Sequence, residues 1–585
     1  MRGLTRRWVL TGPKDRDLRP PDGVDPLICR VLAARGLTDP GKIREFCTPR
    51  LLDLPEPATL PGADRAAARL VAAVRARERI VIYGDYDVDG ITATAILYRT
   101  IRCVAPDADV RTYVPHRLEE GYGLNEDAIR QIVADGANVI VTVDCGITAH
   151  GPAAIAKAGG ADLIITDHHN LPDDAAGLPD AYALVHPRLP GGAYPFGELA
   201  GAGVAFSLAW RFATTWTGSE RVGDVLQKTL LDLLPLAALG TIADVVPLVG
   251  PNRVIAACGL RLIRDTSIIG LRALIEASDL VGEHIDAEHV GFRLGPRLNA
   301  CGRMGHAGEA VTLFTTDDPA IAAPIAEMLA KMNRDRQQTE RAIVAQADEM
   351  ARNAGMTDPD RRVIVLAHDD WHPGVVGIVC SRLVDRYSRP TILLQRQGDV
   401  CKGSARSIDG YSIHAGLCAC ADHLQSFGGH DAAAGLSLAT DRLPDFIAAL
   451  TAHANAHIDG EQLTPSLHID CDASLPELQM ETVRRIGALS PFGRDNPRPT
   501  LRVCEVVVME PPRQMGGHGA HLSLRLRQDG PNGRQGIRCV WWNAGKLASD
   551  LAAGMRLDAV IEPKLNTWNG RTTVEAEIRD VLVRT

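Results

Sequence analysis

The stretch Ile80-Val81-Ile82-Tyr83-Gly84-Asp85-Tyr86-Asp87-Val88-Asp89-Gly90 decides the fold of this chain. Its apolar run ends in three acidic residues at alternate positions, Asp85, Asp87 and Asp89, and a helical pattern at 92–103 follows directly. A short apolar run that leads straight into a helix is typical of a buried strand in a parallel sheet.

Two later apolar runs end in the same way. The run at 139–143 stops at Asp144, and the run at 163–166 stops at Asp167-His168-His169. Helical patterns at 125–135 and 149–158 fill the gaps between these runs. Strands that alternate with helices predict an α/β fold built on a parallel sheet.

The acidic and imidazole side chains at these strand ends should meet, because parallel strands share one carboxyl edge, where open α/β sheets bind ligands. Asp244, within 239–247, is a further candidate from a fourth element. We therefore predict these metal ligands: Asp85, Asp87, Asp89, Asp144, His168 and Asp244. So many carboxylates in one crevice would repel one another unless cations neutralise them.

Hard oxygen ligands mixed with imidazole favour Mn²⁺ or Mg²⁺, and thiolates that would favour zinc are missing apart from Cys145. Two ions about 3.5–4 Å apart would activate a water and steady the leaving oxygen in a displacement at phosphorus. The alternative is that the strand-end aspartates only cap the helices that follow them.

Length and composition bound the remaining possibilities. The 585 residues predict three or four domains. Neither a membrane span nor a secretory signal is expected, and thirteen cysteines without a Cys-x-x-Cys pair fit reduced thiols, so we expect a cytoplasmic protein. The net charge of −9 argues mildly against nucleic-acid binding, yet residues 491–585 carry 14 Lys and Arg against 10 Asp and Glu.

Changes in periodicity divide the chain. We predict an N-terminal segment at 1–50, a first α/β domain at 51–320, a connector helix at 321–355, a second α/β domain at 356–462 and a small β-barrel at 463–585. The connector could instead be one more helix of the first domain.

The second α/β domain contains three glycine-rich or basic pieces, at 371–377, 402–407 and 427–431. Glycines let backbone N–H groups approach phosphate oxygens, and neighbouring Arg, Ser or His side chains add hydrogen bonds. The predicted phosphate-binding residues are Ser404, Arg406, Gly428, Gly429 and His430. Taken singly, such a piece is more often only a turn, and it is the occurrence of three in one domain that favours phosphate binding.

Strand-like alternation at 501–508, 521–527, 537–542 and 572–578 predicts the barrel. Arginines alternate there with Trp541, Trp542 and Trp568, and single-stranded nucleic acid is bound by such cations and stacking aromatics. Adjacent residues face opposite sides of a strand, so one of Trp541 and Trp542 is expected in the core.

The motifs at 81–90, 142–146 and 166–169 resemble the pattern of the DHH phosphoesterase superfamily, with Asp244 as its last metal position. The segments 113–125, 295–303 and 427–430 resemble its single-strand-specific bacterial exonuclease branch. The resemblance covers residues from about 50 to the end. It implies a DHH domain, a DHH-associated domain and an oligonucleotide-binding (OB) barrel that together degrade single-stranded DNA from the 5′ end to mononucleotides in recombination and repair.

Within this resemblance each site residue receives an expected role. Asp144 bridges the two ions, Asp85 and Asp87 hold one ion, and Asp89, His168 and Asp244 hold the other. Asp167 orients the imidazole of its neighbour, and His169 assists the leaving oxygen or contacts the phosphate, with a core histidine as the alternative. Residues expected to hold the phosphate are Arg303, Arg297 and Asn299.

Two other functions stay open. A small-substrate DHH phosphodiesterase cleaves dinucleotides or cyclic dinucleotides, but relatives of that kind usually lack a C-terminal barrel. A non-catalytic DNA-binding scaffold would have lost metal ligands, and every proposed ligand is present here. The resemblance also implies a single-strand-binding protein and a helicase as partners, and a chain with its own barrel could act as a monomer.

Overall fold

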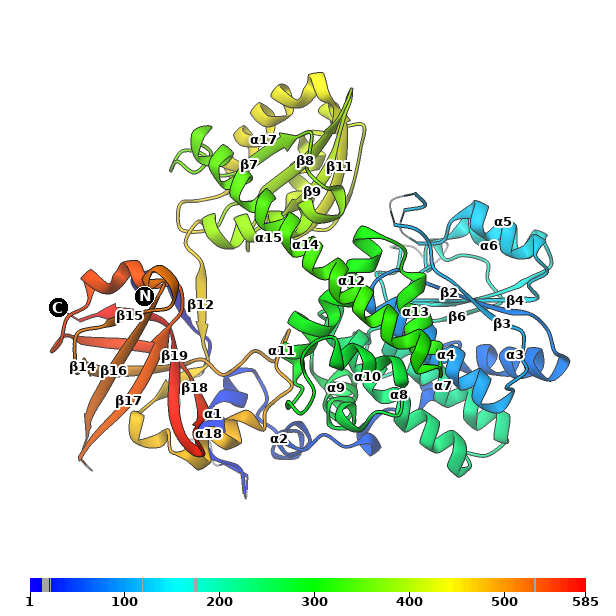
Figure 1. Cartoon of the computed structure of the whole chain (residues 1–585), viewed down its shortest axis with the longest axis horizontal. Coiled ribbons are helices and arrows are strands. Elements are labelled where there is room, and N and C mark those ends of the chain that lie inside the picture. The colour runs from blue at the N-terminus through cyan, green and yellow to red at the C-terminus, as the bar shows by residue number, and fades with distance from the viewer. Residues whose placement is uncertain are drawn as a thin grey trace. The chain divides into compact units, whose positions relative to one another are not determined.

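A computed structural model describes residues 1–12, 20–21, 23–117, 119–121, 123–172, 177–530 and 533–584. The chain forms two compact units. The first comprises Met1–Arg44, Arg336–Ala488 and Pro499–Thr585, and the second comprises Glu45–Asp335 and Leu489–Arg498 (Figure 1). Of the segment 113–125, Leu118 and Tyr122 lie outside the described residues.

The second unit is built on a five-stranded sheet in the order β3-β2-β4-β5-β6, and every pair in it is parallel. The parallel sheet predicted from the sequence is therefore confirmed. The central strands are buried along their whole length, which explains their continuous apolar runs. The strands are β2 (Ile80–Gly84), β3 (Val110–Tyr113), β4 (Val139–Val143), β5 (Asp162–Thr166) and β6 (Ala183–Val185).

Helices pack on this sheet and extend beyond it as a helical region. Those around the sheet are α3 (Ala63–Ala76), α4 (Val88–Val104), α5 (Glu126–Ala134) and α6 (His150–Ala158). The others are α7 (Gly201–Thr217), α8 (Asp224–Ala243), α9 (Gly250–Leu262), α10 (Ile269–Glu276), α11 (Ala287–His289), α12 (Gly295–Met304) and α13 (Gly308–Thr315).

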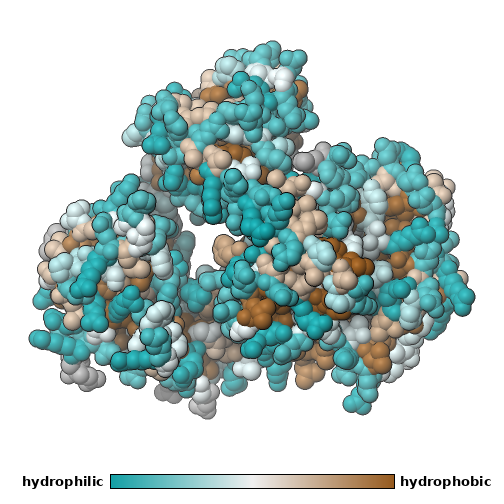
Figure 2. All heavy atoms as spheres, in the orientation of Figure 1, coloured by the Kyte–Doolittle hydropathy of each residue, from teal (hydrophilic) through white to brown (hydrophobic). Residues whose placement is uncertain are grey.

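Helix α8 lies in the core and packs against α4, α7 and α9. Among the described residues, α8 is the one helix that is long and apolar enough to cross a membrane. However, 61% of its most apolar stretch is buried inside the protein, as in core helices of the same composition. The visible face of the molecule carries mostly hydrophilic residues with scattered apolar patches (Figure 2).

The predicted connector is a 35-residue helix, α14 (Pro319–Asn353). The division between the two units falls inside it, between Asp335 and Arg336. The second α/β domain follows, with a mixed sheet in the order β10-β11-β9-β8-β7. Its elements are β7 (Ile364–His368), α15 (Pro373–Tyr387), β8 (Thr391–Gln397), β9 (Val400–Arg406), α16 (Ile413–Ala419), β10 (Ser426–Gly429), β11 (Ala433–Ala439) and α17 (Leu443–His457).

The C-terminal strands form a partly closed ring, in the order β14-β18-β19-β17-β16, that returns to β14 through two residue pairs. This arrangement confirms the predicted small barrel. Its elements are β13 (Cys471–Ala473), α18 (Met480–Gly487), β14 (Leu501–Val508), β15 (Arg513–Met515), β16 (His521–Gly530), β17 (Gly533–Trp541), β18 (Arg556–Trp568) and β19 (Arg571–Val583).

The N-terminal segment belongs to the same unit as the barrel. Strand β1 (Arg7–Leu10) pairs in parallel with β12 (Ser466–Ile469). The Trp8 indole donates a 2.8 Å hydrogen bond to the buried carboxylate of Asp580. Helices α1 (Pro26–Ala34) and α2 (Pro40–Cys47) follow.

Candidate metal centre and substrate-binding residues

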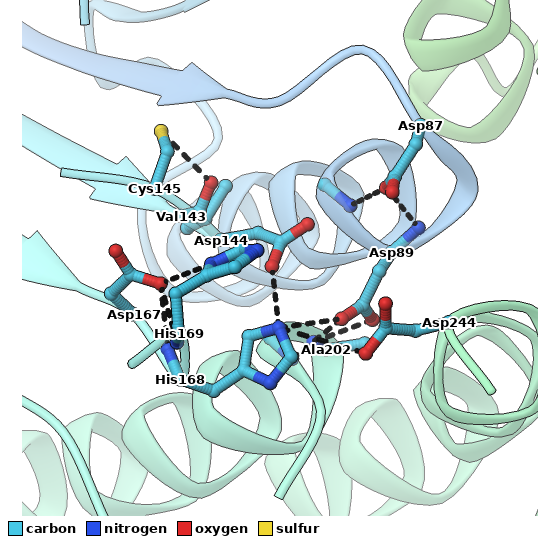
Figure 3. Close-up of polar contacts among 12 residues, drawn as sticks. Asp87, Asp89, Val143, Asp144, Cys145, Asp167, His168, His169, Ala202 and Asp244 are labelled. Atoms are coloured by element: carbon cyan, nitrogen blue, oxygen red, sulfur yellow. Dashed lines mark hydrogen bonds and ion pairs between the residues drawn. The ribbon is translucent and has the colours of Figure 1, made fainter. Parts of the chain in front are cut away.

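The ends of three neighbouring strands place the predicted ligands at one edge of the sheet. Asp85 follows β2, Asp144 follows β4, and the Asp167–His169 segment follows β5. Asp244 is the C-terminal cap residue of α8. Figure 3 shows the side chains of Asp144, His168 and Asp244 pointing toward one another. The convergence expected from parallel strands is present in the structure.

The ligand atoms fall into three overlapping groups, and the atoms of each group lie within 4.8 Å of one another. The groups are Asp85, Asp87 and Asp144; Asp89, His168 and Asp244; and Asp144, His168 and His169. His168 Nε2 lies 3.1 Å from Asp144 Oδ1 and 3.6 Å from Asp244 Oδ2. Asp144 thus stands between the two ligand sets that the sequence assigns to two ions.

The backbone at the centre is strained. Asp144 has φ 64°, and Val245, directly after Asp244, has φ 60°. Such left-handed conformations cost non-glycine residues about 1–3 kcal/mol and cluster at functional sites. A side chain at Gly201 would come within 2.5 Å of Asp144 Oδ1, so glycine is required for α7 to approach this carboxylate.

Two of the aspartates also serve as helix caps. Asp87 Oδ1 accepts hydrogen bonds from the backbone N–H groups of Asp89 and Gly90 at the start of α4. Asp89 accepts hydrogen bonds from the N–H groups of Gly201 and Ala202 at the start of α7. The capping alternative therefore describes part of what these two residues do. It leaves Asp85 unexplained.

Burial and mutual repulsion raise the carboxyl pKa values. Desolvation, then the charge of Asp87, raises the pKa of Asp85 to about 8 and that of Asp89 to about 7. Desolvation, then the charges of Asp89 and Asp87, raises the pKa of Asp244 to about 9. Desolvation and the neighbouring aspartates also raise the pKa of Asp144 well above its usual range. Only nearby positive charge makes such a set of ionised carboxylates stable.

The orphaned atoms of the centre fit a metal ion. Asp85 Oδ1, Asp144 Oδ1 and His168 Nε2 are buried and make no hydrogen bond to any residue that the structure describes. Burial, followed by the charge of His169, lowers the pKa of His168 to about 3, so its imidazole is neutral and able to act as a ligand. Carboxylate oxygens with one imidazole suit Mn²⁺ or Mg²⁺.

Asp167 does not hold the ring that the sequence suggested. We expected it to orient the imidazole of His168, but its Oδ1 lies 2.7 Å from Nδ1 of His169. Burial alone would lower the pKa of His169, yet the hydrogen bond and charge of Asp167 outweigh burial and raise it to about 9. The predicted pairing of Asp167 with His168 is wrong because the neighbouring side chains of Asp167 and His168 point in different directions after the strand ends.

Sequence reasoning missed two residues that support the His168–His169 backbone. His186 is fully buried, and its Nε2 lies 2.8 Å from the carbonyl oxygen of His169. Arg188 donates a hydrogen bond to the carbonyl oxygen of His168 at 2.8 Å. The available signal was the end of β6, where His186 follows an apolar run in the same way as Asp85, Asp144 and Asp167 follow theirs.

Helix α12 carries the three predicted phosphate-binding residues of this unit. A side chain at Gly302 would lie 2.9 Å from the carbonyl oxygen of Tyr86, so α12 approaches the loop between Asp85 and Asp87. Arg303 is the next residue, and its charge acts on Tyr86. Arg297 and Asn299 lie one to two turns earlier, and Arg297 donates to the carbonyl oxygen of Arg293. Of these three residues, only Arg303 directly follows the described close approach of Gly302 to this loop.

The predicted phosphate-binding residues of the second α/β domain lie on neighbouring strands. Ser404 of β9 and Gly428 of β10 both pair with Gly435 of β11. A side chain at Gly377 of α15 would lie 3.3 Å from Ser404 Oγ and 3.5 Å from an Arg406 nitrogen. The other members, Gly429 and His430, are exposed just beyond this pairing.

The barrel tryptophans differ in exposure. Trp541 is only 5% exposed, so its predicted role in nucleic-acid binding is wrong: a ring in the core cannot stack on a base. Trp542 is 43% exposed and contacts His521 edge-on, with ring centroids 4.8 Å apart. Trp568, near the tip of the β18–β19 hairpin, is 75% exposed. Alternation along the strand explains why one of the adjacent pair is buried.

Three family profiles match the chain in order. They are the DHH family, N-terminal domain, at residues 79–240, the DHHA1 domain at 360–456 and the RecJ OB domain at 469–580. The single-stranded-DNA-specific exonuclease RecJ of Bacillus subtilis is 38% identical over 582 residues, which cover 99% of this chain and 71% of that protein. The RecJ of Thermus thermophilus is 35% identical over 540 residues, with 92% and 73% covered.

Solved structures agree with these matches. The crystal structure of Thermus thermophilus RecJ in complex with Mn²⁺ superimposes with a TM-score of 0.82 at 32% identity and covers 98% of this chain and 79% of that one. A second, titled exonuclease RecJ bound to manganese, gives 0.59 at 37% identity, with 70% and 98% covered. The match in sequence, domain order and fold extends over nearly the whole chain, which therefore belongs to the RecJ family of single-stranded-DNA-specific exonucleases.

Proposed function

We propose that the protein is a metal-dependent exonuclease that hydrolyses single-stranded DNA from its 5′ end to mononucleotides and acts in recombination and DNA repair. Membership of the RecJ family supports the enzyme class and the substrate. The observation that carries the proposal is the convergence of five carboxylates and one imidazole in the second unit, with orphaned buried ligand atoms.

Mn²⁺ or Mg²⁺ is the cofactor we propose, as two ions. Asp85 and Asp87 would hold one ion, and Asp89, His168 and Asp244 would hold the other, with Asp144 as the carboxylate that bridges the two. The ions would supply Lewis-acid chemistry, which activates water and neutralises charge at phosphorus.

The other groups of the centre bind and orient the phosphate. His169, held by Asp167, can assist the leaving 3′ oxygen or donate a hydrogen bond to the phosphate. Arg303, on α12 beside Tyr86, is placed to stabilise the negative charge of the transition state. Arg297 and Asn299 would extend this surface along the same helix.

The remaining parts bind the strand. We propose that the 5′ end of the DNA strand is bound by Ser404, Arg406, Gly428, Gly429 and His430. These residues lie on or next to paired strands, and Ser404 and Arg406 lie close to Gly377 of α15. The barrel would stack bases on the exposed rings of Trp542 and Trp568, in place of the buried Trp541.

We keep the domain boundaries predicted from the sequence, at 1–50, 51–320, 321–355, 356–462 and 463–585. Single-stranded DNA is the main partner, and a single-strand-binding protein and a helicase are further proposed partners of a monomeric enzyme. Thirteen free cysteines support the cytoplasm as its compartment.

The test compares substrates and a ligand variant. We expect Mn²⁺-dependent cleavage of a thirty-nucleotide single strand to exceed that of a dinucleotide, and Asp144→Ala to lose both activity and bound Mn²⁺. Preference for the dinucleotide would favour a small-substrate phosphodiesterase. Strand binding without cleavage by the wild type would favour a scaffold, and an active Asp144→Ala with an unchanged metal count would refute the bridging role.

A further inference from the structure

The segment Leu489–Arg498 leaves the first unit and packs with the second. The chain belongs to the first unit up to Ala488 and again from Pro499, and the barrel strand β14 begins at Leu501. A ten-residue excursion of this kind suggests that the segment serves the metal-centre unit rather than only linking two barrel elements.

Buried hydrogen bonds fix the segment in place. The guanidinium of Arg253, which is 2% exposed, donates to the carbonyl oxygens of Ser490 at 3.0 Å and Pro491 at 3.5 Å. The fully buried amide of Asn496 donates to the carbonyl oxygens of Leu489 at 2.9 Å and Pro491 at 2.8 Å. Buried polar bonds like these hold a loop in one conformation.

The same segment is attached beside the metal centre. The Leu248 N–H donates to the carbonyl oxygen of Arg494 at 2.8 Å, and a side chain at Gly493 would come within 2.7 Å of Leu248 Cδ1. Leu248 is four residues beyond the metal-ligand candidate Asp244.

The two arginines of the segment differ in their partners. Arg498 lies 3.2 Å from Glu288 and stacks over the ring of Phe492. The exposed side chain of Arg494 makes no hydrogen bond or ion pair within the described part of the chain. A rigid backbone, bonded to Leu248 just beyond Asp244, therefore carries an uncommitted guanidinium.

We propose that Arg494 binds a backbone phosphate of the substrate strand next to the scissile bond. This inference rests on the proposed exonuclease function and adds a substrate-binding residue to it. An arginine offers planar, paired donors that match phosphate oxygens, and the fixed loop reduces the entropy lost on binding. A phosphate contact carries no sequence information, as a nonspecific exonuclease requires.

The experiment measures the affinity of a thirty-nucleotide single strand in Mn²⁺ at several salt concentrations. Arg494→Ala and Arg494→Lys are compared in the Asp144→Asn background, which prevents cleavage. Steady-state kinetics and Mn²⁺ binding are measured in the active background, where Asp144 is intact. Arg264→Ala is the matched control, because Arg264 is also an exposed arginine. It follows the C-terminal end of α9, about 20 Å from the end of that helix that adjoins Leu248.

We expect Arg494→Ala to weaken binding roughly 10-fold and to reduce the slope of log affinity against log salt by about 0.7, the value for one single-strand phosphate. Arg494→Lys should keep the slope and lose part of the affinity, and Arg264→Ala should match the wild type. An unchanged slope in Arg494→Ala, or a loss of Mn²⁺ binding in that variant, would overturn the inference. Absence of wild-type cleavage would instead reject the underlying exonuclease function.

Discussion

The carboxylates of the metal centre destabilise the metal-free protein at neutral pH. At Asp244, burial and the charges of Asp89 and Asp87 raise the pKa from 3.8 to about 9. A carboxyl whose pKa is higher in the folded than in the unfolded protein lowers the unfolding free energy as the pH rises from the lower pKa to the higher one. This cost in unfolding free energy is absent below about pH 4, increases as the pH rises and reaches its full size above about pH 9.

Asp244→Asn removes this cost and one proposed metal ligand together. In the absence of metal we expect the variant to be more stable than the wild type at pH 8, with a smaller difference at pH 5. Excess Mn²⁺ should reverse the order, because the wild type gains more binding free energy. Thermal unfolding with and without chelator measures both effects. A variant less stable than the wild type at pH 8 without metal would contradict this account.

The strand-end pattern predicted which residues gather at the centre, because the parallel sheet brings its carboxyl ends to one edge. It could not predict the left-handed backbone of Asp144, since that conformation depends on the close approach of α7 at Gly201. Nor could it assign Asp167 to His169 or place Trp541 in the core. Side-chain direction after a strand ends is set by tertiary contacts.

At the scale of elements, ion pairs join the C-terminal half of α14 to α15. Glu340 accepts hydrogen bonds from Arg336 at 2.7 Å and from Arg382 at 2.9 Å. Arg336 and Glu340 are 8% and 7% exposed. About two helical turns after Glu340, Asp348 forms ion pairs with Arg352 and Arg386. Ion pairs thus attach this half of the connector helix to the second α/β domain.

Glu340→Ala would leave the buried guanidinium of Arg336 without its carboxylate. We expect a loss of about 3–5 kcal/mol in the unfolding free energy of this domain. The double variant Arg336→Met with Glu340→Leu should recover most of the loss. Glu126→Ala, which breaks an exposed pair with Arg130, is the control and should change stability by about 1 kcal/mol or less. Unfolding free energies are measured by chemical denaturation. Equal losses for Glu340→Ala and Glu126→Ala would show that Glu340 does not stabilise this domain through its buried ion pair.

Most elements were predictable where their periodicity is strong. The barrel strand at 501–508 has the predicted bounds, and the connector helix begins at Pro319, earlier than its apolar pattern at 325–353 suggested. Strand β18 was missed because its residues 557–563 are all buried. A strand buried on both faces lacks the alternation by which strands are recognised.

At the scale of the whole molecule, segments far apart in sequence meet within each unit. The sequence predicted the order of the domains from changes in periodicity, and family membership confirms the implied DHH, DHH-associated and OB domains. It did not predict that residues 1–44 join the unit of the barrel or that Leu489–Arg498 joins the other unit. Such contacts depend on individual buried side chains and leave no periodic signal.

The N-terminal segment depends on one buried carboxylate. Asp580 is fully buried and accepts hydrogen bonds from Thr5, Arg6 and Trp8. We expect Asp580→Ala to raise the hydrogen exchange of residues 1–10 by at least roughly 10-fold, because these donors lose their acceptor. Asp550→Ala, at an exposed position, serves as the control. Unchanged exchange in Asp580→Ala would show that strand pairing alone holds the segment.

We propose above all that this chain is a metal-dependent 5′-to-3′ exonuclease on single strands. The most direct measurement is product release from single strands labelled at the 5′ or the 3′ end, with and without Mn²⁺, and with duplex DNA and Asp144→Ala as controls. We predict immediate Mn²⁺-dependent release of the 5′ label as a mononucleotide, with duplex spared and the variant inactive. Early release of the 3′ label, or no release while the strand still binds, would contradict the claim.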